Sequence, residues 1–195
     1  MERSKQTSGR WKALAILAIC LLPLAASYFT YYVIKPQART NYGTLLEPRD
    51  YPIPALQATA LDGTPAGLDA YQGKWIMLQV DSAQCPQPCR NKLFQMRQLR
   101  LTQGRERDRV ERVWLVTDQN PVETQLLREY DGTHLLRVRP EIVKNWLPAT
   151  AGTTVADHIY MIDPLGNLMM RFPKDADPNK IKKDLTRLLK ASSIG

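Results

Sequence analysis

Residues 75–101 read WIMLQVDSAQCPQPCRNKLFQMRQLRL, and this stretch decides the fold. The first six positions, 75–80, are apolar at nearly every residue, which is typical of a strand covered on both faces. Apolar residues then recur at helical spacing between positions 93 and 101. The prolines before them suit the first turn of a helix and no later position. The stretch therefore predicts a buried strand that leads through Cys85 and Cys89 into a helix.

The chain beyond this stretch continues to alternate strands with helices. Further short strands are expected at 56–61, 113–116 and 135–138, with helices from Asn120 to about Tyr130 and over 140–147. The apolar segments 158–162 and 168–172 flank turn residues and predict a hairpin, and Asp177-Pro178 opens a final helix. A parallel crossover followed by an antiparallel pair predicts an α/β domain of thioredoxin type over residues 55–195.

The N-terminal region is expected to cross a membrane. Residues 13–34 carry no charge, and at about 1.5 Å of rise per residue they span a hydrocarbon core of about 30 Å. The basic leader, residues 1–12, should stay in the cytoplasm, which places the body on the periplasmic side of the inner membrane. A cleaved signal peptide is the alternative, because small residues follow the apolar run at 24–27. Residues 35–54 contain four prolines and are expected to be a linker.

Composition and charge exclude several classes of protein. The 195 residues are 44% hydrophobic and 24% charged, which is ordinary for a folded chain. The net charge of +8 comes partly from the leader, so the body is only mildly basic and nucleic acid is not an expected partner. Three cysteines cannot form a disulfide framework, and Cys20 is expected to be a packing residue within the membrane. The basic outer face of the final helix is expected to be solvated, with anionic lipid as the alternative contact.

The predicted chemistry lies at Cys85 and Cys89. A C-x-x-x-C spacing is expected to place both sulfurs on the first turn of a helix, whose positive end lowers thiol pKa values. Two such thiolates can hold Cu(I), or they can close into a disulfide. A facing imidazole would complete a trigonal copper site. The alternative is two unrelated small cysteines.

Three segments resemble the Sco/SenC proteins, a family of membrane-anchored, thioredoxin-like copper proteins that help assemble cytochrome c oxidase. These segments are residues 73–93, 115–130 and 157–172. The resemblance implies that Cys85, Cys89 and a histidine hold copper, as Cu(I) and alternatively as Cu(II). It further implies delivery of copper to the copper-bearing subunit of the oxidase, or reduction of the cysteines of that subunit. Another copper carrier or a thioredoxin-like reductant is a further expected partner.

The chain has two candidates for the histidine ligand, His134 and His158. We expect His158 to be the third ligand, because in a thioredoxin-like fold the loop before its strand faces the cysteine helix. Asp157 would then orient the ring as an acceptor. The alternative is a structural histidine. In the Sco pattern the histidine lies about three residues further from the following turn, and an odd offset along a strand reverses the face of a side chain. His134 is expected at an exposed strand edge.

Three functions remain open at this point. The first is a copper-binding assembly factor, which is not a classical enzyme. The second is a membrane-tethered thiol:disulfide oxidoreductase with reductase activity, although dedicated redox motifs more often have the shorter C-x-x-C spacing. The third is a thioredoxin-like interaction domain without chemistry of its own.

Overall fold

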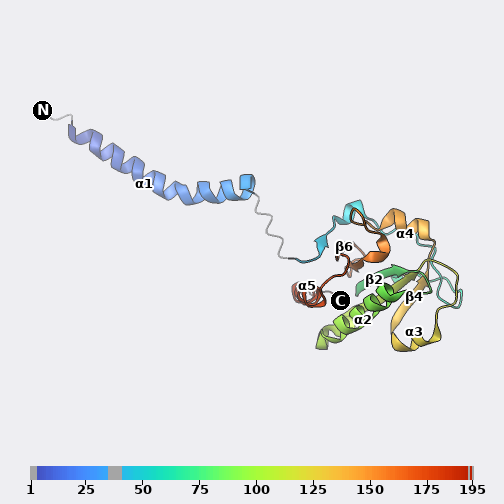
Figure 1. The fold of residues 1–195 in the computed structure, drawn as a ribbon. Coiled ribbons are helices and arrows are strands. Elements are labelled where there is room, and N and C mark those ends of the chain that lie inside the picture. Colours follow the sequence, from blue (N-terminus) through green and yellow to red (C-terminus); the bar gives the residue numbers. More distant parts are fainter. Residues whose placement is uncertain (1–3, 35–40, 193, 195) are drawn as a thin grey trace. The chain divides into compact units, whose positions relative to one another are not determined.

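The computed structural model describes residues 4–34, 41–192 and 194, and it divides the chain into the compact units Met1–Thr40 and Asn41–Gly195 (Figure 1). The first unit consists of helix α1, Ser4–Phe29, which continues into the π-helical turn η1, Thr30–Ile34. Residues Gly9–Tyr32 are long and apolar enough to span a membrane, with a mean hydropathy of 2.1. The expected leader and linker lie partly outside the described residues, at 1–3 and 35–40.

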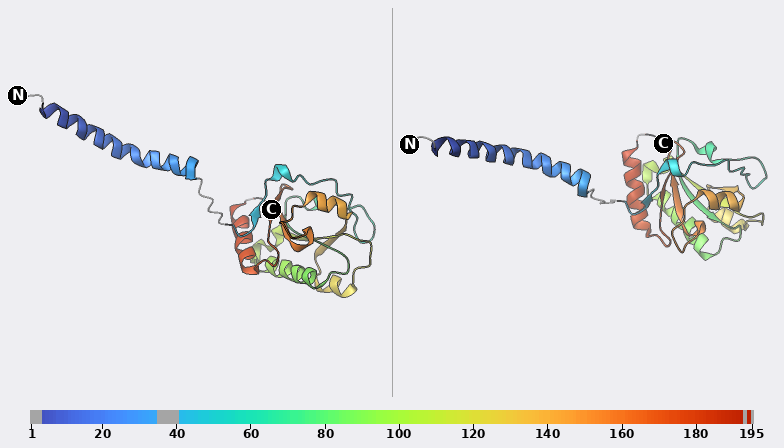
Figure 2. Two further views of the ribbon diagram at one scale, coloured as in Figure 1. Left: turned by 45° about the horizontal axis from the view of Figure 1, so that its top comes forward. Right: turned by 90° about the horizontal axis from the view of Figure 1, so that it is seen from above.

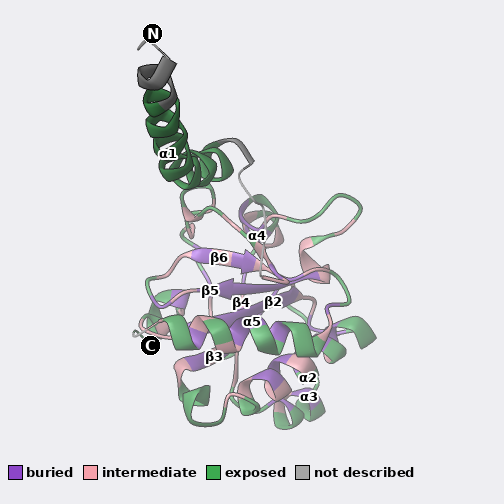
Figure 3. Cartoon of the chain, turned by 90° about the vertical axis from the view of Figure 1, so that its left-hand side faces the viewer, coloured by how far each residue is buried: buried purple, intermediate pink, exposed green. Residues whose placement is uncertain are grey.

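The second unit contains a sheet in the strand order β1-β6-β5-β2-β3-β4. Strands β2, β3 and β4 are parallel to one another, whereas β5, β6 and β1 are antiparallel to their neighbours. Buried strands form the middle of the domain in Figure 3. The strands are β1, Thr44–Leu45; β2, Trp75–Asp81; β3, Val110–Val116; β4, Thr133–Arg137; β5, Ile159–Ile162; and β6, Leu168–Arg171.

Helices cover both faces of the sheet (Figure 2). The α-helices are α2, Gln87–Leu101; α3, Thr124–Glu129; α4, Pro140–Trp146; and α5, Pro178–Ala191. The 3₁₀ turns are η2, Pro48–Asp50; η3, Leu68–Tyr71; η4, Gly104–Arg109; and η5, Val155–Asp157. Alternation along β2 divides the core: Met77 packs on the face shared with α2 and α5, and Leu78 on the face shared with α4. Both faces are therefore apolar, as the sequence of β2 predicts.

Several predicted elements differ in the structure. Residues 56–61 form no strand, because only Thr59 makes isolated bridges there. The helix expected from Asn120 begins instead at Thr124, and the carbonyl oxygen of Asn120 accepts a hydrogen bond from the Arg137 guanidinium at 2.9 Å. The expected linker, residues 35–54, contains β1, which pairs with β6.

Candidate redox and metal site

Cys85 and Cys89 form a disulfide where β2 passes into α2. Their Cα atoms are 5.1 Å apart, and both side chains are 0% exposed. Cys85 precedes the helix and has a φ of 41°, a left-handed conformation that is uncommon outside glycine. Cys89 is the third residue of α2. The two cysteines are brought together, but only Cys89 lies in the first helical turn where both sulfurs were expected.

The segment after β3 shields this disulfide. Leu126 and Tyr130 belong to the same buried cluster as the two cysteines. An ion pair of 2.8 Å joins Arg90 of α2 to Glu123 at the start of this segment. Because the sulfurs are fully buried, a partner thiol or a metal ion reaches them only after the cluster opens.

Gln79 contacts the disulfide through its side-chain amide, a contact that the sequence did not predict. It lies on β2, is 0% exposed, and donates a hydrogen bond from Nε2 to Sγ of Cys89 at 3.6 Å. Its Oε1 is buried and has no hydrogen-bond partner among the described residues. The signal in the sequence was one amide within an otherwise apolar strand, six residues before Cys85.

A buried ion pair, also missed, lies one helical turn beyond Cys89. Nζ of Lys92 is 3.6 Å from Oδ2 of Asp81, and Lys92 also donates a hydrogen bond to the carbonyl oxygen of Ala156. Burial raises the pKa of Asp81, and the charge of Lys92 opposes that rise. Burial likewise lowers the pKa of Lys92, against the attraction of Asp81. Lys92 thus joins α2 to the end of β2 through Asp81 and to the turn η5 before β5 through Ala156.

His158 is fully buried, and both of its ring nitrogens have partners elsewhere. Nδ1 lies 2.8 Å from the carbonyl oxygen of Phe172, and Nε2 lies 2.7 Å from Oγ1 of Thr153. Burial lowers the pKa of His158, which favours the neutral ring. Nδ1–H then donates to the carbonyl oxygen of Phe172, and Nε2 faces the hydroxyl of Thr153. Across residues 4–34, 41–192 and 194, no three His, Cys, Asp or Glu side chains gather as a metal site, so His158 does not join the cysteines here.

Asp157 caps a turn and contacts neither nitrogen of the His158 ring. Its carboxylate accepts from the backbone nitrogen of Thr154 at 2.8 Å and forms an ion pair with Lys174 at 3.1 Å. The hydrogen bond from Thr154 is the main reason why the pKa of Asp157 is lowered to about 2. His134 lies on β4, where it contacts Glu111 at 3.1 Å. Cys20 is a free thiol in α1.

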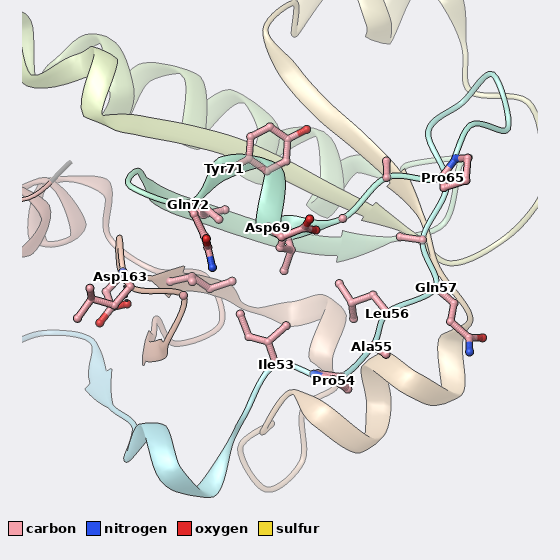
Figure 4. A pocket seen from close by; sticks show the side chains of 18 residues that line it. Ile53, Pro54, Ala55, Leu56, Gln57, Pro65, Asp69, Tyr71, Gln72 and Asp163 are labelled. Atoms are coloured by element: carbon pink, nitrogen blue, oxygen red, sulfur yellow. Dashed lines mark hydrogen bonds between the residues drawn. The ribbon is translucent and has the colours of Figure 1, made fainter.

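Two of the hollows on the described surface of the domain differ in their position relative to the cysteines. A cavity of about 570 Å³ has apolar walls from Ile53 and Leu56 and polar groups from Asp69 and Gln72 (Figure 4). It reaches Ile76 near the beginning of β2, whereas the cysteines follow the other end of that strand. The second hollow, of about 440 Å³, is lined by Gln87 and Pro88, which lie between the two cysteines in sequence, and by the connection from β6 to α5. Neither Cys85 nor Cys89 is among its lining residues.

Comparison with known proteins identifies the domain. The model of a family described as "Transmembrane-like, thioredoxin-like, C-terminal domain" matches residues 75–192. The comparison with curated proteins finds no match.

Solved structures share the fold. Copper-bound ScoI of Bradyrhizobium japonicum is 19% identical, with a TM-score of 0.51 over 68% of this chain and 96% of that one. Copper-bound yeast Sco1 is 14% identical, with a TM-score of 0.55 over 80% of this chain and 96% of that one. The thioredoxin domain of a thiol-disulfide oxidoreductase from Bacteroides vulgatus is 17% identical, with a TM-score of 0.50 over 70% and 94%. The predicted thioredoxin-like fold is confirmed, and the resemblance to Sco/SenC proteins is confirmed at the level of the fold.

Proposed function

Because the chain belongs to the transmembrane-like, thioredoxin-like C-terminal domain family, we propose that its Cys85–Cys89 pair serves the assembly of a copper site in a respiratory cytochrome c oxidase. The observation that carries this proposal is the buried disulfide at the start of α2, beside the amide of Gln79. A dithiol that closes reversibly at a helix N-terminus is suited to exchange electrons with a partner disulfide.

The proposed redox step balances within the pair and its partner. In the dithiol form, one thiolate attacks a sulfur of the partner disulfide and forms a mixed disulfide. That attack expels the first partner thiolate. The second thiolate of the pair then attacks the sulfur of the other cysteine of the pair in the mixed disulfide, which expels the second partner thiolate and leaves the Cys85–Cys89 disulfide. Two electrons pass to the partner, and the two protons of the Cys85–Cys89 dithiol end on the two thiols of the partner. A thioredoxin-like dithiol, as the reductant, would restore the reduced pair.

Copper carriage is the second candidate function, in which the reduced Cys85–Cys89 pair holds the ion as cargo. Two thiolates suit Cu(I), and the Sco structures that share this fold contain copper. His158 remains the proposed third ligand, and to bind it must exchange the contact of Nε2 with Thr153 for the metal. Without that exchange the site is two-coordinate, or the partner subunit completes it. Delivery to the oxidase requires the same opening of the buried cluster as thiol exchange.

The proposed location follows from the N-terminal helix. A single-pass α1 with its basic end in the cytoplasm would hold residues 41–195 on the periplasmic side of the inner membrane. Protease added to spheroplasts should then digest the domain. Protection of the intact chain would contradict this topology.

Two measurements on the full chain test the function. After reduction, Cu(I) stoichiometry should be one per chain in the wild type and in the control Cys20→Ala, and zero in Cys85→Ser/Cys89→Ser. Titration against glutathione should give one two-electron potential for the pair. Thiol–disulfide exchange without copper binding would favour the function of an oxidoreductase. The absence of both activities would favour the function of an interaction domain. If the affinity for Cu(I) falls in His158→Ala and not in His134→Ala, the result would support His158 as the third copper ligand.

A further inference from the structure

Positive charge is concentrated in a single helix of the domain. Between residues 41 and 177 the chain has 16 Lys and Arg against 17 Asp and Glu. Helix α5 alone has five Lys and Arg against one Asp. The remainder of the domain is thus nearly neutral, and the net positive charge of the whole domain comes from α5.

These cations lie on one face, directed to solvent. The outer face of α5 consists of the exposed residues Pro178, Asn179, Lys180, Lys182, Lys183, Arg187, Lys190 and Ala191. Five of these eight residues are cationic and none is acidic. The one carboxylate of the helix, Asp184, is 2% exposed and faces inward. Figure 3 shows this outer face as an exposed band along the helix.

The first residues of the domain contact the same helix, α5. Oδ2 of Asp184 accepts hydrogen bonds from the backbone nitrogens of Tyr42 and Gly43, at 2.7 and 2.9 Å. The hydroxyl of Tyr42 accepts one from the nitrogen of Asp177, the N-cap of α5, and Nζ of Lys180 lies 5.2 Å from the Tyr42 ring centre. The first residues of the domain are therefore held against α5, and Lys180 of its basic face lies over the Tyr42 ring. The backbone of these residues runs beside α5 in Figure 2.

The length of chain before this attachment limits how far α5 can be from a bilayer. Eight residues, 33–40, separate the apolar span Gly9–Tyr32 from Asn41, and a fully extended chain of eight residues spans at most about 29 Å. If residues 9–32 cross the membrane, the attachment of the domain stays near the lipid headgroups. A cationic surface in that position attracts anionic headgroups, by about fivefold in association for each Lys or Arg.

We propose that the outer face of α5 docks on the surface of the bilayer by binding anionic lipid headgroups. This interaction goes beyond the proposed thiol and copper chemistry and depends only on the membrane anchor. Docking through α5 would determine which sides of the domain remain accessible to partners. The disulfide would lie outside the docked face, because it is at the start of a different helix, α2.

Amine labelling of the full chain in lipid nanodiscs tests the proposal. Nanodiscs of phosphatidylcholine alone are compared with nanodiscs that also contain phosphatidylglycerol, and brief acetylation of each lysine is measured by mass spectrometry. At low salt, Lys180, Lys182, Lys183 and Lys190 should be labelled about threefold more slowly in the anionic discs, while the exposed Lys144 on α4 is unchanged. High salt should remove the difference.

Matched variants distinguish a docking face from net charge. Lys182→Glu/Lys183→Glu should abolish the protection of Lys180 and Lys190 in anionic discs, and the neutral pair Lys182→Gln/Lys183→Gln should weaken it. Arg105→Glu/Arg128→Glu makes the same change in charge at exposed positions outside α5 and should leave the protection intact. Equal labelling of α5 in both kinds of disc would overturn the proposal. Loss of protection in the Arg105/Arg128 control would also overturn it, as would a chain that enters neither kind of disc.

Discussion

The side-chain amide of Gln79 donates a hydrogen bond to Sγ of Cys89 across 3.6 Å of a fully buried interior. The carbonyl oxygen of the same amide is buried without a partner among the described residues. An unsatisfied buried acceptor destabilises a fold by about 1–3 kcal/mol, so Gln79 is a costly residue if packing is its only role. Its contact with the sulfur predicts a role in the chemistry of the thiol.

Replacing Gln79 by leucine should make the disulfide harder to reduce. The amide stabilises a Cys89 thiolate through a charge-assisted hydrogen bond, and leucine cannot do so. We expect a higher pKa for the Cys89 thiol in Gln79→Leu and a reduction potential more negative by about 30 mV, which corresponds to about 1.4 kcal/mol. Glutathione titration measures the potential. Gln125→Leu, at an exposed position, is the control, and an unchanged potential in Gln79→Leu would refute the role.

Breaking the ion pair between Arg90 and Glu123 should speed reduction of the disulfide. The pair is partly exposed, with side chains 36% and 49% accessible, so it contributes about 0.2–1 kcal/mol. If the buried cluster must open before a thiol can enter, Glu123→Gln should raise the rate of reduction by dithiothreitol roughly twofold to fivefold. Glu106→Gln, which removes a surface ion pair with Arg109, should leave the rate unchanged. Equal rates in wild type and Glu123→Gln would exclude this segment as the barrier.

Removing the cation of the buried ion pair should destabilise the domain more than removing both charges. Lys92→Met removes the cation from the largely buried carboxylate of Asp81, to which the backbone nitrogen of Ser82 still donates, and should lower the free energy of unfolding by roughly 3 kcal/mol. The double variant Lys92→Met/Asp81→Leu should recover much of that loss. Urea denaturation of the single and double variants provides the comparison.

The stability lost in Lys92→Met should depend on pH in a defined direction. Without Lys92, the pKa of Asp81, already raised by burial, should rise further. A carboxyl group whose pKa is raised in the folded state is least destabilising when protonated, so the deficit of Lys92→Met should shrink as the pH falls through that pKa. A deficit that grows on acidification would contradict the assignment.

Asp184 should hold the beginning of the domain in place. Asp184→Asn weakens two hydrogen bonds to the backbone of Tyr42 and Gly43, each worth about 1.5–3 kcal/mol when the acceptor is charged. We expect a lower melting temperature and faster amide hydrogen exchange at residues 42–45. Glu141→Gln, an exposed acid on α4, should change neither quantity.

Local patterns were sufficient for much of the fold. Continuous apolar sequence predicted β2 within one residue, because a strand buried on both faces has no polar alternation. Asp177-Pro178 predicted the start of α5, since an N-cap carboxylate and a proline at the first helical position act within the same turn. The pairing of Cys85 with Cys89 was one of two states that their spacing allows.

The sequence by itself thus determined the order of the elements, the apolar N-terminal helix and the position of the two cysteines, because each depends on neighbouring residues. Only the tertiary structure decided what surrounds the sulfurs. Gln79 approaches Cys89 from an adjacent strand, and both ring nitrogens of His158 are held by Phe172 and Thr153. Spacing along the chain cannot predict such contacts, because buried polar groups take whichever partners the packing of several elements brings within hydrogen-bonding distance.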